Sequence, residues 1–268
     1  MDLNTAAADT LLRLRERSPL VHNITNFVSM DIVANALLAV GASPLMAHAI
    51  EEVDEIVALT GAVVINIGTL SPEWVKAMEQ AADKALALAK PWVLDPVGAG
   101  ATSYRTTTSL DLAWRRPTIV RGNASEILAL AGAERATKGV DSTRASSDAR
   151  DAAESLAREL GCVVAVTGQI DYVTDGARML SVGNGHPMMA RVTALGCTAS
   201  ALVGACVAVS PDDPLPAAAH ALAIIGACGE RAARSAAAPG LFRAKLVDAL
   251  FELTPSDLRN EAKLGVER

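Results

Sequence analysis

The chain is poor in aromatic residues, and its charge balance is acidic. Phe, Trp and Tyr together make up 3% of its 268 residues, which argues against a module that binds single-stranded nucleic acid by stacking bases on rings. The 24 Lys and Arg and 30 Asp and Glu residues give a net charge of −6. Neither nucleic acid nor an anionic membrane is therefore an expected partner, and an anionic substrate must be held by local groups.

Signals for metal clusters, export and membrane insertion are also missing. The four cysteines form no C-x-x-C pair, so the sequence predicts neither a zinc site nor a disulfide framework, and a reducing compartment is the simpler inference. The first residues lack the basic and apolar regions of a signal peptide. The apolar stretch 221–238 is interrupted by Glu230, Arg231 and Arg234, and no run is long enough to span a bilayer. We expect a cytoplasmic protein.

The two common nucleotide-binding loops are absent as well. There is no Gly-Lys dipeptide and hence no Walker A loop. The glycines at 98 and 100 are not followed by a third at the dinucleotide-binding spacing. A nucleotide, if one binds, is held in another way.

Short apolar runs alternate with helical patterns through the first two thirds of the chain. The expected strands cover 20–24, 44–46, 62–67, 92–94, 118–121 and 162–167, and the expected helices 5–16, 29–40, 51–60, 71–90, a segment after 125, and 148–160. Asp175-Gly176 predicts a hairpin between 172–174 and 178–182. Three helices follow, at 198–209, 215–238 and 241–251, and the polar segment 133–147 is expected to be a surface loop. The alternation predicts one α/β domain over 1–268, with a doubly wound parallel sheet.

In such sheets ligands bind beyond the carboxyl ends of the strands, and four polar stretches fall there, at 23–26, 95–100, 121–126 and 167–169. Asp95 ends one strand and precedes a glycine-rich loop, where it can approach a metal or phosphoryl oxygen or simply cap a turn. Arg121 can pair with phosphate. Glu126 can serve a magnesium ion, or it can form a capping box with Asn123. A hydroxyl at Thr167 can bind phosphate.

The segment 191–205 places a glycine-containing turn directly before an apolar helix. The first N–H groups of a helix lack partners and carry positive charge, so Ala194 to Thr198 can form an anion cradle with Cys197 at its rim. The alternative is a buried helix with Thr193 as its cap and Cys197 as a small core residue.

Six motifs occur together in one order. They are HNITN at 22–26, NALLAVGASPLM at 35–46, DPVGAGAT at 95–102, RGNASEI at 121–127, GHPMM at 185–189 and VTALGC at 192–197. This combination resembles the hydroxyethylthiazole kinase family, thiamine-salvage enzymes with a ribokinase-like fold in which helices flank a mostly parallel sheet on both sides. The resemblance extends from His22 to the last helix.

The resemblance implies phosphorylation of the alcohol of 4-methyl-5-(2-hydroxyethyl)thiazole by ATP and Mg²⁺, in a homotrimer with active sites between subunits. The roles that it implies are these: Met46, Asn23 and Ala194 bind the thiazole; Arg121, Thr167 and Asp95 bind ATP; Asp95 and Glu126 organise the metal; and Gly196 and Cys197 are catalytic.

One departure from the family pattern concerns the substrate side. The family usually has Thr-Gly-Thr-Gly-Cys where this chain has Thr193-Ala194-Leu195-Gly196-Cys197. Gly196 is retained beside the helix mouth. Cys197 stands where most kinases of the superfamily carry an aspartate, and we expect the helix end to lower its pKa, while a nearby phosphate opposes that effect.

The rival functions are a related kinase for hydroxymethylpyrimidine or pyridoxal, a nucleotide-dependent dehydratase on a similar fold, and a non-catalytic binder. The apparent size of the Asn23 and Met46 wall disfavours the dehydratase. The combination of Asp95, Glu126 and Arg121 disfavours a binder, which needs no metal and phosphate machinery.

Overall fold

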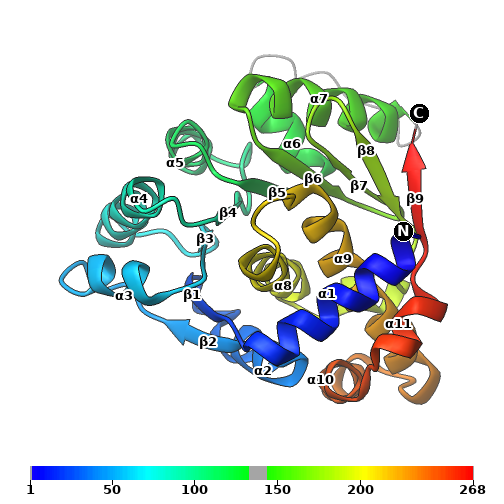
Figure 1. The fold of residues 1–268 in the computed structure, drawn as a ribbon. Helices are drawn as coiled ribbons and strands as arrows, with labels where there is room; N and C mark the ends of the chain where they lie inside the picture. Colours follow the sequence, from blue (N-terminus) through cyan, green and yellow to red (C-terminus); the bar gives the residue numbers. More distant parts are fainter. Residues whose placement is uncertain (1, 133–143, 268) are drawn as a thin grey trace.

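A nine-stranded sheet forms the centre of the computed structural model, which describes residues 2–132 and 144–267 (Figure 1). Its strands run in the order β2-β1-β3-β4-β5-β6-β7-β8-β9. Their bounds are β1 Leu20–Ile24, β2 Ser43–Met46, β3 Ala62–Asn66, β4 Trp92–Asp95, β5 Ile119–Asn123, β6 Val163–Thr167, β7 Asp171–Thr174, β8 Met179–Val182 and β9 Leu264–Glu267.

The first six strands are parallel, and the last three join antiparallel to their neighbours. The chain passes from β1 outward to β2, then returns to β3 on the other side of β1 and continues in that direction. The strand order therefore reverses between β1 and β3. In open α/β sheets the crevice at such a switch point is where ligands bind.

Helices cover both faces of the sheet (Figure 1). One face carries α1 Leu3–Arg17, α2 Met30–Val40, α8 Leu195–Val209, α9 Pro214–Ser235, α10 Pro239–Glu252 and α11 Pro255–Glu261. The other carries α3 Val53–Leu59, α4 Pro72–Ala87, α5 Ser103–Ala113, α6 Ala124–Ala131 and α7 Arg144–Leu160. Each layer buries its own apolar cluster against the sheet, as in a three-layer sandwich.

Helix α8 lies in the middle of its layer and is buried along most of its length, which explains why its sequence is apolar on nearly every side. It approaches β3 closely because residue 204 is glycine. A Cβ at Gly204 would lie 2.5 Å from Cγ2 of Val64. This contact sets the close packing of α8 on β3.

The sequence-based assignment of elements is wrong in four places. Helix α5 was not expected, because its Thr-rich sequence has weak helix propensity; the Thr102 side chain caps it by accepting from Arg105 N. Helix α8 begins at Leu195, not at residue 198, because Ala194 adopts a left-handed conformation. The final α11 and β9 were missed. Of the expected loop 133–147, residues 133–143 lie outside the described residues. Residues 144–147 form the start of α7 instead of a loop.

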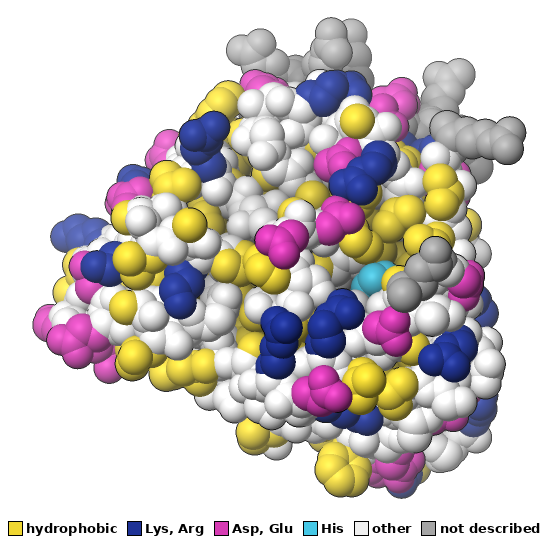
Figure 2. Space-filling model, in the orientation of Figure 1, with side chains coloured by type: hydrophobic (Ala, Val, Ile, Leu, Met, Phe, Trp, Pro, Cys, Tyr) yellow, Lys and Arg dark blue, Asp and Glu magenta, His cyan; other side chains and the backbone are white. Residues whose placement is uncertain are grey.

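The surface carries mixed charge. Figure 2 shows basic and acidic side chains interspersed with apolar ones over the face that it presents. Within the two described ranges, the helices all fall short of the length and apolar content needed to cross a membrane.

Candidate active site

Five polar side chains come together at or near the carboxyl ends of five neighbouring parallel strands. They are Asn23, Asn66, Asp95, Arg121 and Thr167. The residue two positions earlier in each strand belongs to the core cluster that packs against α8; these residues are Val21, Val64, Val93, Ile119 and Ala165. Because side chains alternate between the faces of a sheet, all five polar side chains point to the α8 side.

Arg121 and Thr167 lie at the start of α8. Arg121 Nη2 donates to Thr167 Oγ1 at 2.7 Å, and a Cβ on Gly196 would lie 3.0 Å from Arg121 Nη1. Only the absence of a side chain at Gly196 lets the guanidinium approach the helix backbone. The sequence-predicted residues Arg121, Thr167 and Gly196 are thus brought together.

The first turn of α8 offers unpaired N–H groups. Its first intrahelical bond runs from Thr198 N to Ala194 O at 2.9 Å, and among the described residues no side chain caps the helix start. The alternative interpretation of this segment, a buried helix capped by Thr193, is therefore wrong about the cap. The amides of residues 195–197 form the positive end of the helix dipole, and the Arg121 guanidinium lies beside them. This combination of positive charge and N–H donors favours the binding of an anion.

A cavity of about 590 Å³ adjoins this helix start. Its polar wall contains Arg121, Thr167 and Asp171, and its apolar wall contains Leu222 and Ile225 of α9. The volume falls in the range of small-molecule sites, which reach about 1,000 Å³. The cavity is therefore large enough for a small molecule and has its basic group, Arg121, on the wall nearest the start of α8.

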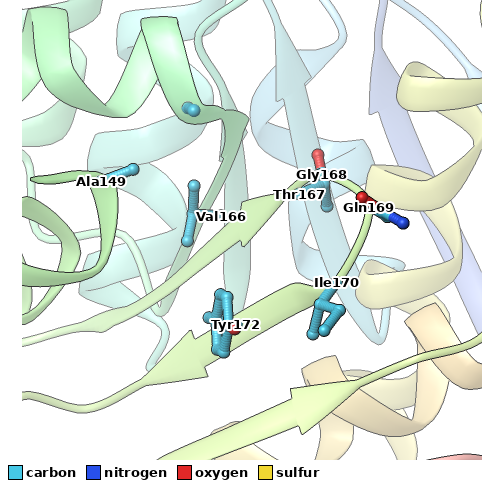
Figure 3. Close-up of a pocket in the computed structure, with 8 residues that line it drawn as sticks. Ala149, Val166, Thr167, Gly168, Gln169, Ile170 and Tyr172 are labelled. Atoms are coloured by element: carbon cyan, nitrogen blue, oxygen red, sulfur yellow. The ribbon is translucent and has the colours of Figure 1, made fainter. Parts of the chain in front are cut away.

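A second, smaller cavity of about 160 Å³ lies on the other side of the turn between β6 and β7. Figure 3 shows Val166, Ile170 and Tyr172 from the two strands and their turn, with Ala149 from α7. Asp171 secures the turn by accepting from Gly168 N at 2.9 Å. Burial raises the pKa of Asp171 to about 6, against the opposing effects of that N–H and of Arg121.

Asp95 is fully enclosed at the end of β4. Its Oδ2 accepts from Asn66 Nδ2 at 2.6 Å and from Ser200 Oγ at 2.8 Å, whereas Oδ1 has no hydrogen-bond partner among the described residues. Burial raises the pKa of Asp95 to about 6; the charge of Glu126 adds to the rise and that of Arg121 opposes it.

Glu126 forms the capping box that the sequence left as an alternative. Its Oε2 accepts from Asn123 N at 2.8 Å, and Asn123 Oδ1 accepts from Glu126 N at 3.0 Å. Its Oε1 accepts from Gly98 N at 3.0 Å. Both carboxylate oxygens therefore accept hydrogen bonds from backbone N–H groups, and Glu126 links the loop after Asp95 to the start of α6.

Cys197 is partly buried in the first turn of α8, where Asn26 Nδ2 donates to its Sγ at 3.3 Å. The expected lowering of its pKa is wrong. Burial raises the pKa of the Cys197 thiol, and the nearby Asp95 carboxylate adds to the rise, while the Asn26 and Asn66 amides and Arg121 oppose it. Burial thus keeps the thiol protonated, so little thiolate is present to accept a proton in this site.

The predicted thiazole residues occupy the β1 and β2 side. Asn23 and Met46 are register partners on these parallel strands. Asn23 Nδ2 donates to Val21 O at 2.9 Å, and its buried Oδ1 is free of partners within the described chain. Met46 and Ala194 are partly buried, and both pack against the core cluster of the α8 face.

The sequence motifs assigned no role to three residues that the structure places at or beside the site: Asn66, Ser200 and Arg105. Arg105, on the unexpected helix α5, donates from Nη1 to Ile67 O at 3.0 Å and Val97 O at 2.8 Å, and from Nη2 to Gly68 O at 2.7 Å. It thus ties together the loops after β3 and β4. The one sequence signal for Asn66 was its position as a polar residue ending an apolar strand.

Comparison with known proteins identifies the family. The model of the hydroxyethylthiazole kinase family matches residues 11–256. The chain belongs to the hydroxyethylthiazole kinase family. It is 48% identical to the hydroxyethylthiazole kinase of Desulfotalea psychrophila, over 98% of this chain and 96% of that protein. It is 50% identical to that of Pyrococcus furiosus, over 97% and 98%.

The structure of the hydroxyethylthiazole kinase protein from Pyrococcus horikoshii OT3 matches with a TM-score of 0.92 and 47% identity, over 98% of this chain and 99% of that one. Pyridoxal kinase from Staphylococcus aureus matches with a TM-score of 0.59 and 16% identity, over 80% and 88%, a likeness in fold alone. The predicted membership of the hydroxyethylthiazole kinase family and the ribokinase-like α/β fold are confirmed.

Proposed function

We propose that this chain transfers the γ-phosphoryl group of ATP to the hydroxyl of 4-methyl-5-(2-hydroxyethyl)thiazole, giving the thiazole phosphate used to make thiamine. The observation that carries the proposal is the convergence of Arg121, Thr167 and the uncapped start of α8 on one cavity, in a chain of this kinase family. We treat residues 1–268 as one kinase domain.

The chemistry requires positioning and charge neutralisation more than covalent participation by the protein, because phosphoryl transfer has a loose transition state. Arg121 and the amides of Gly196 and Cys197 would stabilise negative charge on the transferring group. Thr167 would orient the guanidinium and bind a phosphate oxygen. Cys197, with its raised pKa, would assist as a proton acceptor or hydrogen-bonding group without being indispensable.

The residues present fit a magnesium ion held mainly by the nucleotide. No group of three His, Cys, Asp or Glu suited to a metal occurs in the described ranges, but Mg²⁺ in kinases uses one or two carboxylates together with phosphates and water. Asp95 would hold the ion or its water through the unpartnered Oδ1. Glu126 would contribute negative charge while it holds the loop. The bound ion would neutralise charge on the phosphates.

The thiazole would lie over Asn23, Met46 and Ala194, at a site that a second subunit of a homotrimer completes. Phe27 and Val28 support this proposal, because they are 69% and 60% exposed and directly follow Asn26, which contacts Cys197. Light scattering coupled to size exclusion should give a trimer. Phe27→Asp should shift it toward monomers and lower kcat/KM for the alcohol.

We place the reaction in the cytoplasm, where ATP is supplied and the four free thiols stay reduced. The direct test is a coupled assay of ADP release with ATP and Mg²⁺, offering the thiazole alcohol, hydroxymethylpyrimidine and pyridoxal in parallel. ADP release that depends on the thiazole supports the proposal. Turnover with another alcohol alone would show that Ala194-Leu195 redirects specificity, and release with none of the three would refute it.

A further inference from the structure

Four hydrogen bonds, together with the backbone of α8, connect five side chains into a ring at the candidate active site. Asn26 Nδ2 donates to Cys197 Sγ at 3.3 Å and to Asn66 Oδ1 at 2.8 Å. Asn66 Nδ2 donates to Asp95 Oδ2 at 2.6 Å, and Ser200 Oγ donates to the same oxygen at 2.8 Å. Cys197 and Ser200 are three residues apart on α8 and so share one helix face, and the helix backbone between them joins the two ends of the ring.

The ring crosses the switch point of the sheet. Asn26 follows β1, and Asn66 ends β3, so their hydrogen bond spans the two strands between which the order reverses. Asn66 and Asp95 are register partners on β3 and β4. Asn26, Asn66, Asp95 and Ser200 are each at most 4% exposed. Hydrogen bonds removed from water in this way hold their geometry more firmly than exposed ones.

Asn66 is the centre of the ring. Its Oδ1 accepts from Asn26 Nδ2 and also from Gly68 N at 3.0 Å, which fixes the amide and leaves its Nδ2 to donate to Asp95. Space is tight around this contact, because a Cβ on Gly68 would lie 2.5 Å from Asn26 Nδ2. The amide therefore cannot rotate without breaking several bonds.

The two donors on Asp95 both use Oδ2. A carboxylate that receives two hydrogen bonds on one oxygen is restrained in rotation about its terminal bond, and its other oxygen keeps its capacity to accept. In this structure that other oxygen, Oδ1, has no protein partner in the described ranges. The two oxygens of Asp95 therefore differ: Oδ2 is fixed by two hydrogen bonds, and Oδ1 is buried without a described partner.

We propose that Asn66 and Ser200 are positioning residues of the phosphoryl transfer, which hold Asp95 so that Oδ1 serves the magnesium ion and triphosphate. This inference rests on the proposed function. Partners that orient a metal-binding carboxylate change metal affinity or activity by about 10- to 100-fold when they are removed. A residue with a merely structural role would change thermal stability and leave the metal dependence alone.

The decisive measurement is ATP affinity by calorimetry with and without Mg²⁺, because it needs no alcohol substrate. Wild type should bind ATP more tightly with Mg²⁺. In Ser200→Ala and Asn66→Ala that advantage should fall by about tenfold or more, with ATP affinity in the absence of metal nearly unchanged. Ser200→Cys, similar in shape with a weaker donor, should fall between wild type and Ser200→Ala.

Steady-state rates give a second readout. Both variants should lower kcat by about 10- to 100-fold and raise the Mg²⁺ concentration for half-maximal rate, with KM for the alcohol little changed. Ser109→Ala is the matched control, since Ser109 is also a fully buried helical serine with one hydrogen bond, to Arg105 O at 2.7 Å. It should retain the wild-type metal dependence.

Ser200→Ala keeps the test open if Asn66→Ala does not fold, because alanine favours helix. Wild-type Mg²⁺ dependence in folded Ser200→Ala, with unchanged kcat, would overturn the positioning role while leaving the kinase assignment intact. If wild type phosphorylates a different alcohol, the proposed substrate is wrong, and the calorimetric comparison still decides on Asn66 and Ser200.

Discussion

Replacing Gly196 with alanine tests whether the start of α8 and Arg121 bind the triphosphate. The new Cβ would lie 3.0 Å from Arg121 Nη1, closer than carbon and nitrogen normally approach. The guanidinium would have to move away from the helix start by a few tenths of an ångström, and this movement strains its 2.7 Å bond to Thr167. Loss of one hydrogen bond to a charged phosphate is worth about 1.5–3 kcal/mol, so kcat/KM for ATP should fall by about 10- to 100-fold.

The same substitution should not destabilise the protein. Alanine is favoured over glycine inside a helix by up to about 1 kcal/mol, and for a chain of this size that corresponds to a rise in Tm of about 2–4 °C at most. Activity and stability are thus expected to move in opposite directions, which separates a damaged site from a damaged fold.

Gly240→Ala supplies the matched control. Gly240 is the second residue of α10, as Gly196 is of α8, and a Cβ at Gly240 meets no described atom within 4 Å. We would measure kcat/KM for ATP and thermal unfolding for both variants. If kcat/KM for Gly196→Ala stayed within about threefold of the Gly240→Ala value, the assignment of the α8 start as the phosphate site would be refuted.

Three further predictions follow from backbone strain, burial and thiol chemistry. Ala194→Gly should raise the free energy of unfolding measured in urea by up to about 1 kcal/mol. It removes the cost of about 1–2 kcal/mol for alanine at φ 65°, and the greater entropy of glycine in the unfolded chain offsets about 0.4–1 kcal/mol of this gain. A loss of stability would contradict this prediction. Burial raises the pKa of Asp171 to about 6 in the folded protein, so stability falls as the pH rises from the usual aspartate pKa of about 4 to 6. Asp171→Asn removes this fall, and its Tm gain over wild type should be larger at about pH 8 than at about pH 4.5; an equal gain would refute the burial argument. Cys197→Ser should lower kcat by less than about 10⁴-fold, the upper limit usual for a general base, and Cys197→Asp should keep or raise it; a larger loss in the serine variant would make the thiol essential.

Local patterns predicted most of the fold, because buried parallel strands produce continuous apolar runs such as 62–66. The same reasoning failed for α5, whose helix depends on the Thr102 cap and on the tertiary bonds of Arg105. It failed again at Ala194, because a left-handed alanine is costly and becomes possible only when the surrounding structure imposes it.

The residues of the candidate site also divide into those that local sequence predicted and those that it did not. Arg121, Asp95 and Thr167 were predictable as polar residues that end apolar strands. Ser200 was not, because it bonds to Asp95 across 105 positions of sequence, and nothing local distinguishes it from other small residues of α8. The direction of the Cys197 pKa shift also depended on tertiary structure, since burial and the Asp95 charge, which raise it, both result from the packed fold.

By itself the sequence determined the family, the order of most elements and the residue types that reach the carboxyl edge of the sheet, since these depend on motifs and on local periodicity. Tertiary structure alone decided which polar groups meet. Strand order placed Asn26 beside Asn66 across the switch point, and the close packing at Gly204 set α8 over β3. Such contacts join segments far apart in the chain, and only the packed fold specifies them.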